Sequence, residues 1–343
     1  MVEQRTALMT GVGTDTDSPA ASALSAAAPD AASAVFLDEP AAVRRAADEL
    51  ADGRAVLHGF AGLYALTARP EPEAVARVNR LKGRPEGQPG SVTTVPSLVP
   101  GLFDWTRLPA ELPRRQVWSL MEELYELGPF GFRGPAADRL PGHLTAVRDG
   151  VRTVQVITPG RLCPSNEFLA AALDRIRSGP EPEPAHGTRP HAEPRTEHHA
   201  EPHTQPRAEP GPKAGPKSRP SGGFLFVTSA NRSRELPHWR GDGAVRDFGH
   251  EPGVRILAHR DDEAARRRYP HHAPVSVSIV SFHRPAGRGR AGLPALTLER
   301  PGSLSAEHIR SVAANHGFSL VVAPAAAAGP RPGPRVYLPP VRR

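Results

Sequence analysis

The sequence uses arginine almost exclusively as its cation, and one lysine stands out against that background. It contains 40 Arg and three Lys, and Lys213 and Lys217 lie in a proline-rich stretch. Lys82 instead follows Leu81, at the end of a segment with helical apolar spacing, and begins a Lys-Gly-Arg-Pro turn. A compact ammonium differs from a guanidinium in hydration and donor geometry. Because Arg84 follows two positions later, both cations can contact one polyanion.

Later segments carry hydroxyl, amide and guanidinium groups that suit a phosphate or another small anion. An apolar run at 224–227 leads into a Thr-Ser-Ala-Asn bend at 228–231. The segment 275–282 is expected to be a strand with Ser276 and Ser278 on one face, and Arg300 follows in an Arg-Pro-Gly step. Taken singly, these are also patterns of a helix stop, a polar turn and the solvated face of a strand. We expect the turn at 82–85 and the bend at 228–231 to fold together into a pocket that binds an anionic ligand.

The elements that must position these groups alternate between helix and strand. Apolar residues at helical spacing predict helices over 41–52, 72–81, 114–127, 167–176 and 305–316. Short apolar runs predict strands at 34–37, 55–57, 153–157, 224–227, 275–282, 296–298 and 318–322. Strands that alternate with helices indicate the α/β class, in which helices pack on a sheet.

Three stretches do not fit a folded core. Residues 1–33 lack a periodic apolar pattern, residues 180–220 contain eleven prolines and five histidines, and residues 324–343 are rich in Ala, Pro, Gly and Arg. Such segments bury too little apolar surface to offset their ordering entropy. We expect a disordered leader, a disordered insertion and a disordered tail, with one domain over 34–323. The histidines lack a rigid frame, so no metal site is expected.

Charge and cysteine content exclude several classes of protein. The net charge is +7, and residues 221–343 alone carry +9, which suits a phosphate-bearing partner or a solvated arginine-rich surface. A single cysteine, Cys163, excludes an intrachain disulfide and a cysteine-based zinc site. No apolar run approaches the ~18 residues of a membrane span, and no secretory signal is evident. We expect a cytoplasmic protein without a membrane partner or DNA sequence recognition.

In this order the motifs resemble those of the YrdC-like family, the threonylcarbamoyl-adenylate synthases. That family carries a PT(D/E)TxYGL strand, a helix ending in KxRP, a TSANxSG bend, an STVV-like strand and an RxG step. The corresponding stretches here are 59–66, 82–85, 228–233, 276–280 and 300–302. The resemblance spans roughly residues 34–316 and is interrupted by the proline-rich segment.

The resemblance implies a twisted, open mixed sheet with flanking helices around a basic cavity. It also implies ATP, bicarbonate and L-threonine as substrates, with Mg²⁺ as counter-ion. The threonine carbamate attacks the α-phosphorus, and the resulting threonylcarbamoyl-AMP feeds tRNA modification. Lys82 and Arg84 would act on the reacting groups as catalytic residues. ATP and bicarbonate would be bound by Lys82, Arg84, Thr228, Ser229, Asn231, Ser276, Ser278 and Arg300.

The amino-acid side of the family pattern is altered in this chain. Of the PT(D/E)TxYGL strand only Tyr64 and Leu66 remain, and an arginine of the family's VAVR strand becomes Ile157. Phe60, Tyr64 and Ile157 would form an enlarged, more apolar acceptor pocket for threonine or another amino acid. Two functions therefore remain open: an ATP-dependent enzyme, or a catalytically inactive module that binds nucleotide or double-stranded RNA through its basic surface.

Overall fold

Twelve strands form one mixed sheet in the computed structural model, which describes residues 35–178, 223–233, 235–289 and 292–324. They are β1 (Val35–Phe36), β2 (Ala55–Phe60), β3 (Leu63–Ala68), β4 (Ser91–Thr93), β5 (Phe130–Pro135), β6 (Thr145–Arg148), β7 (Val151–Thr158), β8 (Leu225–Ser229), β9 (Val254–Ala258), β10 (Ile279–Ser281), β11 (Ala295–Arg300) and β12 (Ser319–Val322). Their order is β1-β9-β2-β3-β8-β4-β7-β5-β10-β11-β12, and β6 pairs with β7 outside this path. The predicted α/β class with an open mixed sheet is confirmed.

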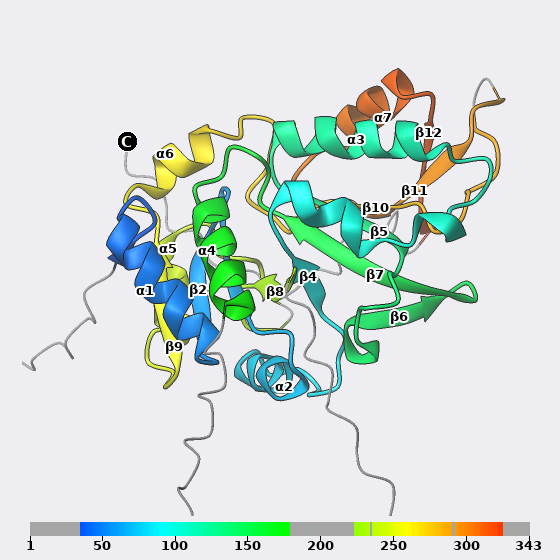
Figure 1. The fold of residues 1–343 in the computed structure, drawn as a ribbon. Coiled ribbons are helices and arrows are strands. Elements are labelled where there is room, and N and C mark those ends of the chain that lie inside the picture. Colours follow the sequence, from blue (N-terminus) through cyan, green and yellow to red (C-terminus); the bar gives the residue numbers. More distant parts are fainter. Residues whose placement is uncertain (1–34, 179–222, 234, 290–291, 325–343) are drawn as a thin grey trace, which may run out of the picture. The chain divides into compact units, whose positions relative to one another are not determined.

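Seven α-helices and three short 3₁₀ segments accompany the described strands (Figure 1). The α-helices are α1 (Pro40–Ala51), α2 (Pro72–Leu81), α3 (Arg114–Leu127), α4 (Ser165–Arg177), α5 (Gly241–Phe248), α6 (Asp262–Arg267) and α7 (Ala306–Asn315). The 3₁₀ segments are η1 (Pro96–Leu102), η2 (Trp105–Arg107) and η3 (Gly142–Leu144).

Strand β2 is covered on both faces. Val56 packs in a cluster with apolar residues of α1 and α4, whereas Ala55 and Leu57 belong to the main core together with Ala244 and Phe248 of α5. All six residues of β2 are buried. A strand buried on both faces reads as a continuous apolar run rather than an alternating one, as the sequence at 55–57 does.

Strand β8 joins the two halves of the chain in one sheet. It pairs antiparallel with β3, where Leu66 lies opposite Thr228, and antiparallel with β4, where Val92 lies opposite Phe226. Because β3 and β4 precede residues 179–222 and β8 follows them, the strands on both sides of that segment are direct neighbours. The bend that follows β8 is thereby fixed beside the end of α2, which lies between β3 and β4 in the chain.

Helix α2 begins and ends where the sequence predicts. Pro72 occupies the first turn, where its missing N–H has no helical partner to lose, and Glu73 is favourable at that end. Val75 and Val78 are buried. The helix stops at Lys82 because Gly83 follows with φ +67°, a left-handed conformation that favours glycine.

One predicted strand is much shorter than expected. The strand predicted over 275–282 begins only at Ile279, so Ser276 and Ser278 lie in the loop before β10 rather than on a strand face. The loop is held by the 301–304 segment, since Ala273 N–H donates to the Ser303 carbonyl and Ser303 N–H to the Ser276 carbonyl, each at 2.8 Å. Backbone bonding to a loop therefore replaces sheet pairing here.

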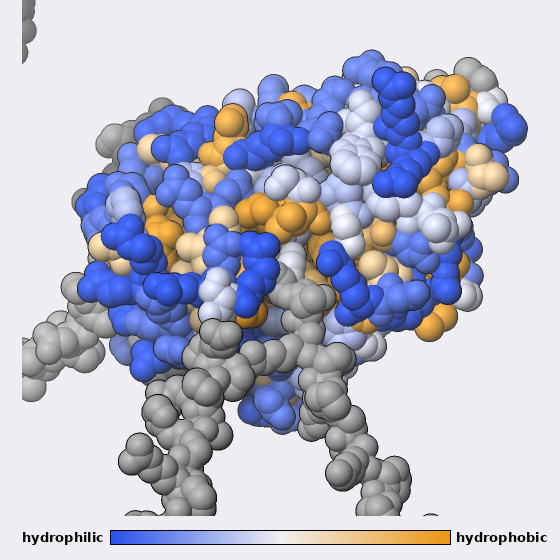
Figure 2. Space-filling view, viewed as in Figure 1, coloured by the Kyte–Doolittle hydropathy of each residue, from blue (hydrophilic) through white to orange (hydrophobic). Residues whose placement is uncertain are grey.

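The leader (1–33), the insertion (180–220) and the tail (324–343) predicted from composition lie outside the described residues, apart from Pro324. Within the described part, every helix is too short or too polar to cross a membrane. The face drawn in Figure 2 is largely hydrophilic, with apolar side chains in patches among charged ones.

Candidate active site

The turn after α2 and the bend after β8 are in contact, as the sequence predicts. Arg84 Nη1 donates to Thr228 Oγ1 at 3.0 Å, and the Ser233 N–H donates to the Lys82 carbonyl at 2.9 Å. The two segments are more than 140 residues apart in the chain, and the antiparallel pairing of β8 with β3 and β4 brings them together. Both segments contribute to one site.

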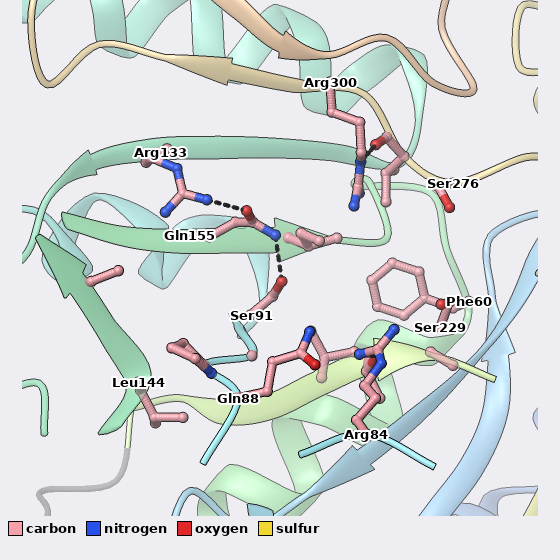
Figure 3. Close-up of a pocket in the computed structure, with 18 of the residues that line it drawn as sticks. Phe60, Arg84, Gln88, Ser91, Arg133, Leu144, Gln155, Ser229, Ser276 and Arg300 are labelled. Atoms are coloured by element: carbon pink, nitrogen blue, oxygen red, sulfur yellow. Dashed lines mark hydrogen bonds between the residues drawn. The ribbon is translucent and has the colours of Figure 1, made fainter. Parts of the chain in front are cut away.

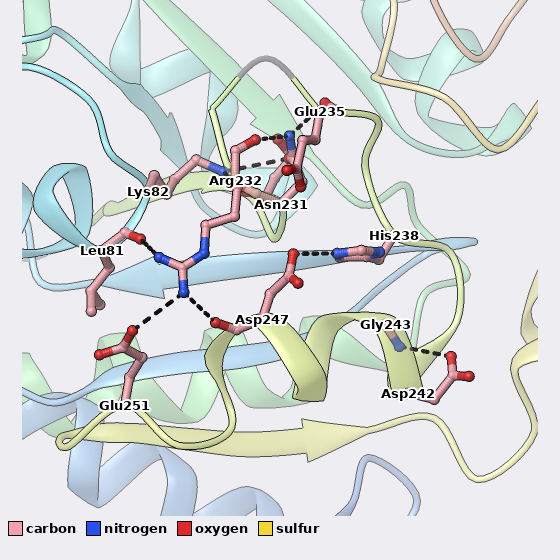
Figure 4. A network of polar contacts seen from close by, with 11 residues as sticks. Leu81, Lys82, Asn231, Arg232, Glu235, His238, Asp242, Gly243, Asp247 and Glu251 are labelled. Atoms are coloured by element: carbon pink, nitrogen blue, oxygen red, sulfur yellow. Dashed lines mark hydrogen bonds and ion pairs between the residues drawn. The ribbon is translucent and has the colours of Figure 1, made fainter. Parts of the chain in front are cut away.

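Lys82 lies behind the bend rather than in front of it. Its ammonium donates to the carbonyls of Ser229 and Asn231 and lies 3.4 Å from Asn231 Oδ1 (Figure 4). The side chain is 1% exposed, and burial, with a contribution from Arg84, lowers its pKa to about 7. The lysine thus fixes the backbone of the bend, and a direct contact with nucleotide stays a prediction.

Arg232 also connects the bend to the end of α2, but here the bend supplies the donor. It belongs to the bend, and its Nη1 donates to the Leu81 carbonyl at 2.9 Å while its Nη2 donates to the Asp247 carbonyl at 2.9 Å (Figure 4). The Asn231 amide donates to the carbonyls of Arg232 and Glu235. Asn231 therefore shapes the bend, and its side chain does not line the cavity described next.

A cavity of about 390 Å³ opens in front of the bend (Figure 3). Its volume lies in the range of roughly 300–1,000 Å³ typical of small-molecule sites. Arg84, Thr228 and Ser229 contribute one wall, and Ser276 and Arg300 contribute another. Five of the eight positions predicted to bind ATP and bicarbonate therefore line one cavity, whereas Lys82, Asn231 and Ser278 do not.

Ser278 is turned away from the cavity because its loop packs on the segment after Arg300. Its hydroxyl donates to the Leu304 carbonyl at 2.8 Å and accepts from the Leu304 N–H at 3.2 Å. Gly302 makes this packing possible, since a Cβ there would lie 2.2 Å from the Ser276 carbonyl oxygen. The expectation that both serines share one ligand-facing side is therefore wrong.

Four arginines line the cavity, and two of them, Arg84 and Arg300, carry charge that the described residues do not neutralise. Arg84 and Arg300 form no ion pair with any described carboxylate. Burial lowers the pKa of Arg84, and it lowers the pKa of Arg300 to about 10, with Arg133 and Arg84 adding repulsion. Arg300 Nε donates to the Val277 carbonyl at 2.8 Å. Both residues are half-buried, and partial desolvation of a guanidinium without a counter-ion is costly, so this pair favours a bound anion.

The inner end of the cavity is apolar. Phe60, Ile157, Val227 and Val277 pack in one buried cluster, and each also lines the cavity. Tyr64 lines the cavity too, but its hydroxyl donates to Asp262 Oδ1 at 2.7 Å. The predicted acceptor residues Phe60, Tyr64 and Ile157 are thus brought together as an apolar surface, in which the tyrosine hydroxyl has a partner of its own.

A comparison with solved structures finds two structures of Sua5 from P. abyssi. One is of a double variant, and the other is of a complex with L-threonine. Both share 16% sequence identity with this chain, with TM-scores of 0.48 and 0.47, and they cover 82% and 81% of it. The chain spans 62% and 58% of their length, less than two thirds in each case. YciO from E. coli shares 12% identity at a TM-score of 0.43, over 72% of this chain and 87% of its own.

These matches are likenesses to individual solved structures, at TM-scores below 0.5. Sua5 and YciO both belong to the family that the sequence motifs resemble. At these identities the likeness concerns the fold alone. No protein-family model matches the chain, and no curated protein matches it either.

The outer part of the cavity holds polar residues that the sequence reasoning missed. Gln88, Ser91, Arg133, Arg148 and Gln155 all line it. A signal was present in β7, where Thr153, Gln155 and Ile157 alternate with apolar residues and face one side of the strand. Gln155 lies between two buried valines, Val154 and Val156, and a glutamine in such a position needs hydrogen-bond partners.

The donor set suits phosphate better than a protein-bound metal. The described residues contain no cluster of three or more His, Cys, Asp or Glu side chains that could hold an ion, and the residues lining the cavity include no carboxylate. Mg²⁺ prefers a few carboxylates together with substrate phosphates. In this cavity the ion would therefore come with the phosphates it coordinates.

Proposed function

We propose that this chain binds ATP in the cavity and catalyses chemistry of the threonylcarbamoyl-adenylate synthase type. The observation that carries the proposal is the pair Arg84 and Arg300, two half-buried guanidiniums without a described carboxylate partner that line one cavity. Anionic transition states of nucleotidyl transfer are stabilised by positioned cations and donors more than by an acid–base pair.

The reaction needs three components. The amine of an amino acid combines with bicarbonate to give a carbamate and water. A carbamate oxygen then attacks the α-phosphorus of ATP, the bond between that phosphorus and the bridging oxygen breaks, and pyrophosphate leaves with the electron pair. Arg84 and Arg300 would hold the reacting phosphate, and the Ser229 and Ser276 hydroxyls would donate beside them.

In this proposal the amino-acid acceptor would bind at the inner, apolar end of the cavity. Phe60, Ile157, Val227 and Val277 present only carbon there, and a side chain without charge is favoured in such surroundings. Threonine, which the sequence resemblance names, is one acceptor, and amino acids with larger apolar side chains are the altered alternative. A product of this kind would feed tRNA modification.

Mass spectrometry of the products tests the proposal. The full chain is incubated with ATP, Mg²⁺, bicarbonate and a pool of amino acids, and the expected result is a carbamoyl-adenylate together with pyrophosphate. The product should disappear when bicarbonate or the amino acids are left out. Unconsumed ATP under all of these conditions would contradict the proposed reaction.

A basic surface favours a second candidate function, a module that binds RNA without turnover. Arg266, Arg267 and Arg268 are exposed at the end of α6. The guanidiniums of Arg240 and Arg266 lie 4.4 Å and 5.0 Å from the ring centre of Trp239. Retention of duplex RNA that weakens steeply with salt, without ATP consumption, would favour this candidate.

A further inference from the structure

A chain of hydrogen bonds crosses the sheet on the wall of the outer cavity (Figure 3). Gln155 on β7 lies opposite Arg133 on the antiparallel strand β5 and next to Ser91 on β4. Arg133 Nε donates to Glu299 Oε2 at 2.7 Å, Arg133 Nη2 donates to Gln155 Oε1 at 2.5 Å, and Gln155 Nε2 donates to Ser91 Oγ at 2.6 Å. We call these four residues the Glu299–Ser91 relay.

Only one assignment of donors and acceptors is possible along the relay. A guanidinium has donors and no acceptor, so Gln155 must turn its carbonyl oxygen toward Arg133. The amide nitrogen is then the group that faces Ser91, and Ser91 must accept from it. The Ser91 hydroxyl hydrogen is then free, since this hydroxyl donates to none of the described residues. Ser91 is 7% exposed and lines the cavity, so the hydrogen is available to a group that enters the cavity.

We propose that Ser91 donates this hydrogen to an oxygen of a phosphate chain, and that the outer part of the cavity is the site of the pyrophosphate that leaves. Most phosphate oxygens are ionised at neutral pH and accept hydrogen bonds, which matches the group that the relay leaves free. Arg148 and Arg133 also line the cavity, and although Arg133 is paired with Glu299, no carboxylate lines the cavity. Ser91 would touch the ligand, whereas Gln155 and Arg133 would be positioning residues.

The orientation of the nucleotide follows. The α-phosphate would lie between Arg84 and Arg300, the pyrophosphate would extend toward Ser91, and the acceptor would occupy the apolar end near Phe60. This inference rests on the proposed function, which identifies the bound phosphate chain as part of ATP. Binding of inorganic pyrophosphate does not depend on turnover and tests the site directly.

A double-mutant cycle measured by calorimetry with inorganic pyrophosphate tests the relay. Ser91→Ala removes the donor and should weaken pyrophosphate binding by roughly 10- to 100-fold, the range for a hydrogen bond to a charged group. Gln155→Glu keeps the contact with Arg133, but its second oxygen accepts the Ser91 hydrogen and so removes it from the ligand. Adding Ser91→Ala to Gln155→Glu should therefore change the affinity little further. Ser119→Ala, on the exposed face of α3, is the matched control.

The cycle separates the relay from simple repulsion by a new carboxylate. If repulsion were the whole effect, Ser91→Ala would weaken binding equally in both backgrounds, which would overturn the proposal. An unchanged affinity in Ser91→Ala, or no pyrophosphate binding by the unaltered chain, would overturn it as well. Should Gln155→Glu fail to fold, Ser91→Thr decides: it keeps the hydroxyl and should bind at least tenfold more tightly than Ser91→Ala.

The proposed reaction and the proposed pyrophosphate site can each be contradicted without the other. Pyrophosphate binding that follows the cycle without any carbamoyl-adenylate would support the relay and contradict the proposed reaction. Turnover of ATP with a pyrophosphate affinity that is indifferent to Ser91→Ala would support the reaction and overturn the relay. Adenosine, which lacks phosphate, should bind the unaltered chain and Ser91→Ala equally.

Discussion

The ammonium of Lys82 lies within hydrogen-bond reach of both the carbonyl and the side-chain oxygen of Asn231, at the back of the bend that faces the cavity. The lysine therefore acts on the site through the backbone. An ammonium with three hydrogens can hold several carbonyls at once, and a guanidinium has a planar fork that does not fit such a cage. This explains why a chain that otherwise uses arginine has lysine at this position.

Lys82→Met should change the pH dependence of stability. Burial lowers the pKa of Lys82 from 10.5 to about 7, so between those values the unfolded chain binds a proton that the folded chain has lost. Stability rises with pH wherever the unfolded state binds more protons. The free energy of unfolding of the unaltered chain, minus that of Lys82→Met, should therefore grow between about pH 7 and 10.5, by at most about 1.4 kcal/mol per unit.

Denaturant unfolding at several pH values measures this difference. Arg80→Met, an exposed position on α2, is the control and should show no such trend. A constant difference between the unaltered chain and Lys82→Met across the window would mean that the ammonium remains charged on folding. Lys82→Met should also be the less stable protein at pH 10, since the carbonyls of Ser229 and Asn231 lose their donor, at a cost of about 1–3 kcal/mol.

Arg84→Met should weaken ATP binding without lowering the stability of the fold. Arg84 is partly buried without a described counter-ion, so replacing it with an apolar side chain should leave the melting temperature unchanged or raise it. The same change removes one of the four arginines that line the cavity and should weaken ATP binding by roughly 10- to 100-fold. Calorimetry and thermal unfolding of the same preparation test both halves. A lower melting temperature with full ATP affinity would show that the guanidinium is structural.

Five of the seven described α-helices were predicted because local spacing decides them, whereas α5 and α6 were missed. Helix α2 follows its apolar positions and ends at Leu81, two residues before Gly83, and α3 spans the predicted 114–127. Strand β9 was missed because Val254, Arg255 and Ile256 are only half-buried, and the strand exists through its pairing with β1 and β2 on either side. Strand propensity depends on such neighbours more than helix propensity does.

The sequence indicates which segments form the site, but it does not indicate which way their side chains point. The sequence indicates that the turn at 82–85 and the bend at 228–231 meet, and they do. It does not reveal that Lys82 approaches the bend from behind, because that depends on how β8 docks beside the end of α2. Ser278 illustrates the same limit, since its direction follows from a backbone contact with Leu304 that no spacing encodes.

Tyr64→Phe should affect stability and leave nucleotide binding unchanged. The Tyr64 hydroxyl donates to Asp262 Oδ1 at 2.7 Å and accepts from the His259 N–H at 3.1 Å, so it connects β3 to α6 and not to a ligand. Its loss should lower the free energy of unfolding by about 1–3 kcal/mol. An ATP affinity that falls more than tenfold while stability is retained would instead place the hydroxyl in the binding site.

Ile157→Val should broaden the acceptor preference toward larger side chains. Ile157 packs with Phe60, Val227 and Val277 at the inner end, and removing one methylene there costs about 0.5–1.5 kcal/mol of stability while it enlarges the cavity. One methylene in an apolar pocket discriminates substrates by roughly 10- to 200-fold. With leucine and valine supplied in equal amounts, mass spectrometry should show a higher ratio of leucine to valine product for Ile157→Val than for the unaltered chain. Val321→Ala, an exposed position on β12, should leave the ratio unchanged, and an identical ratio in Ile157→Val would place the acceptor elsewhere.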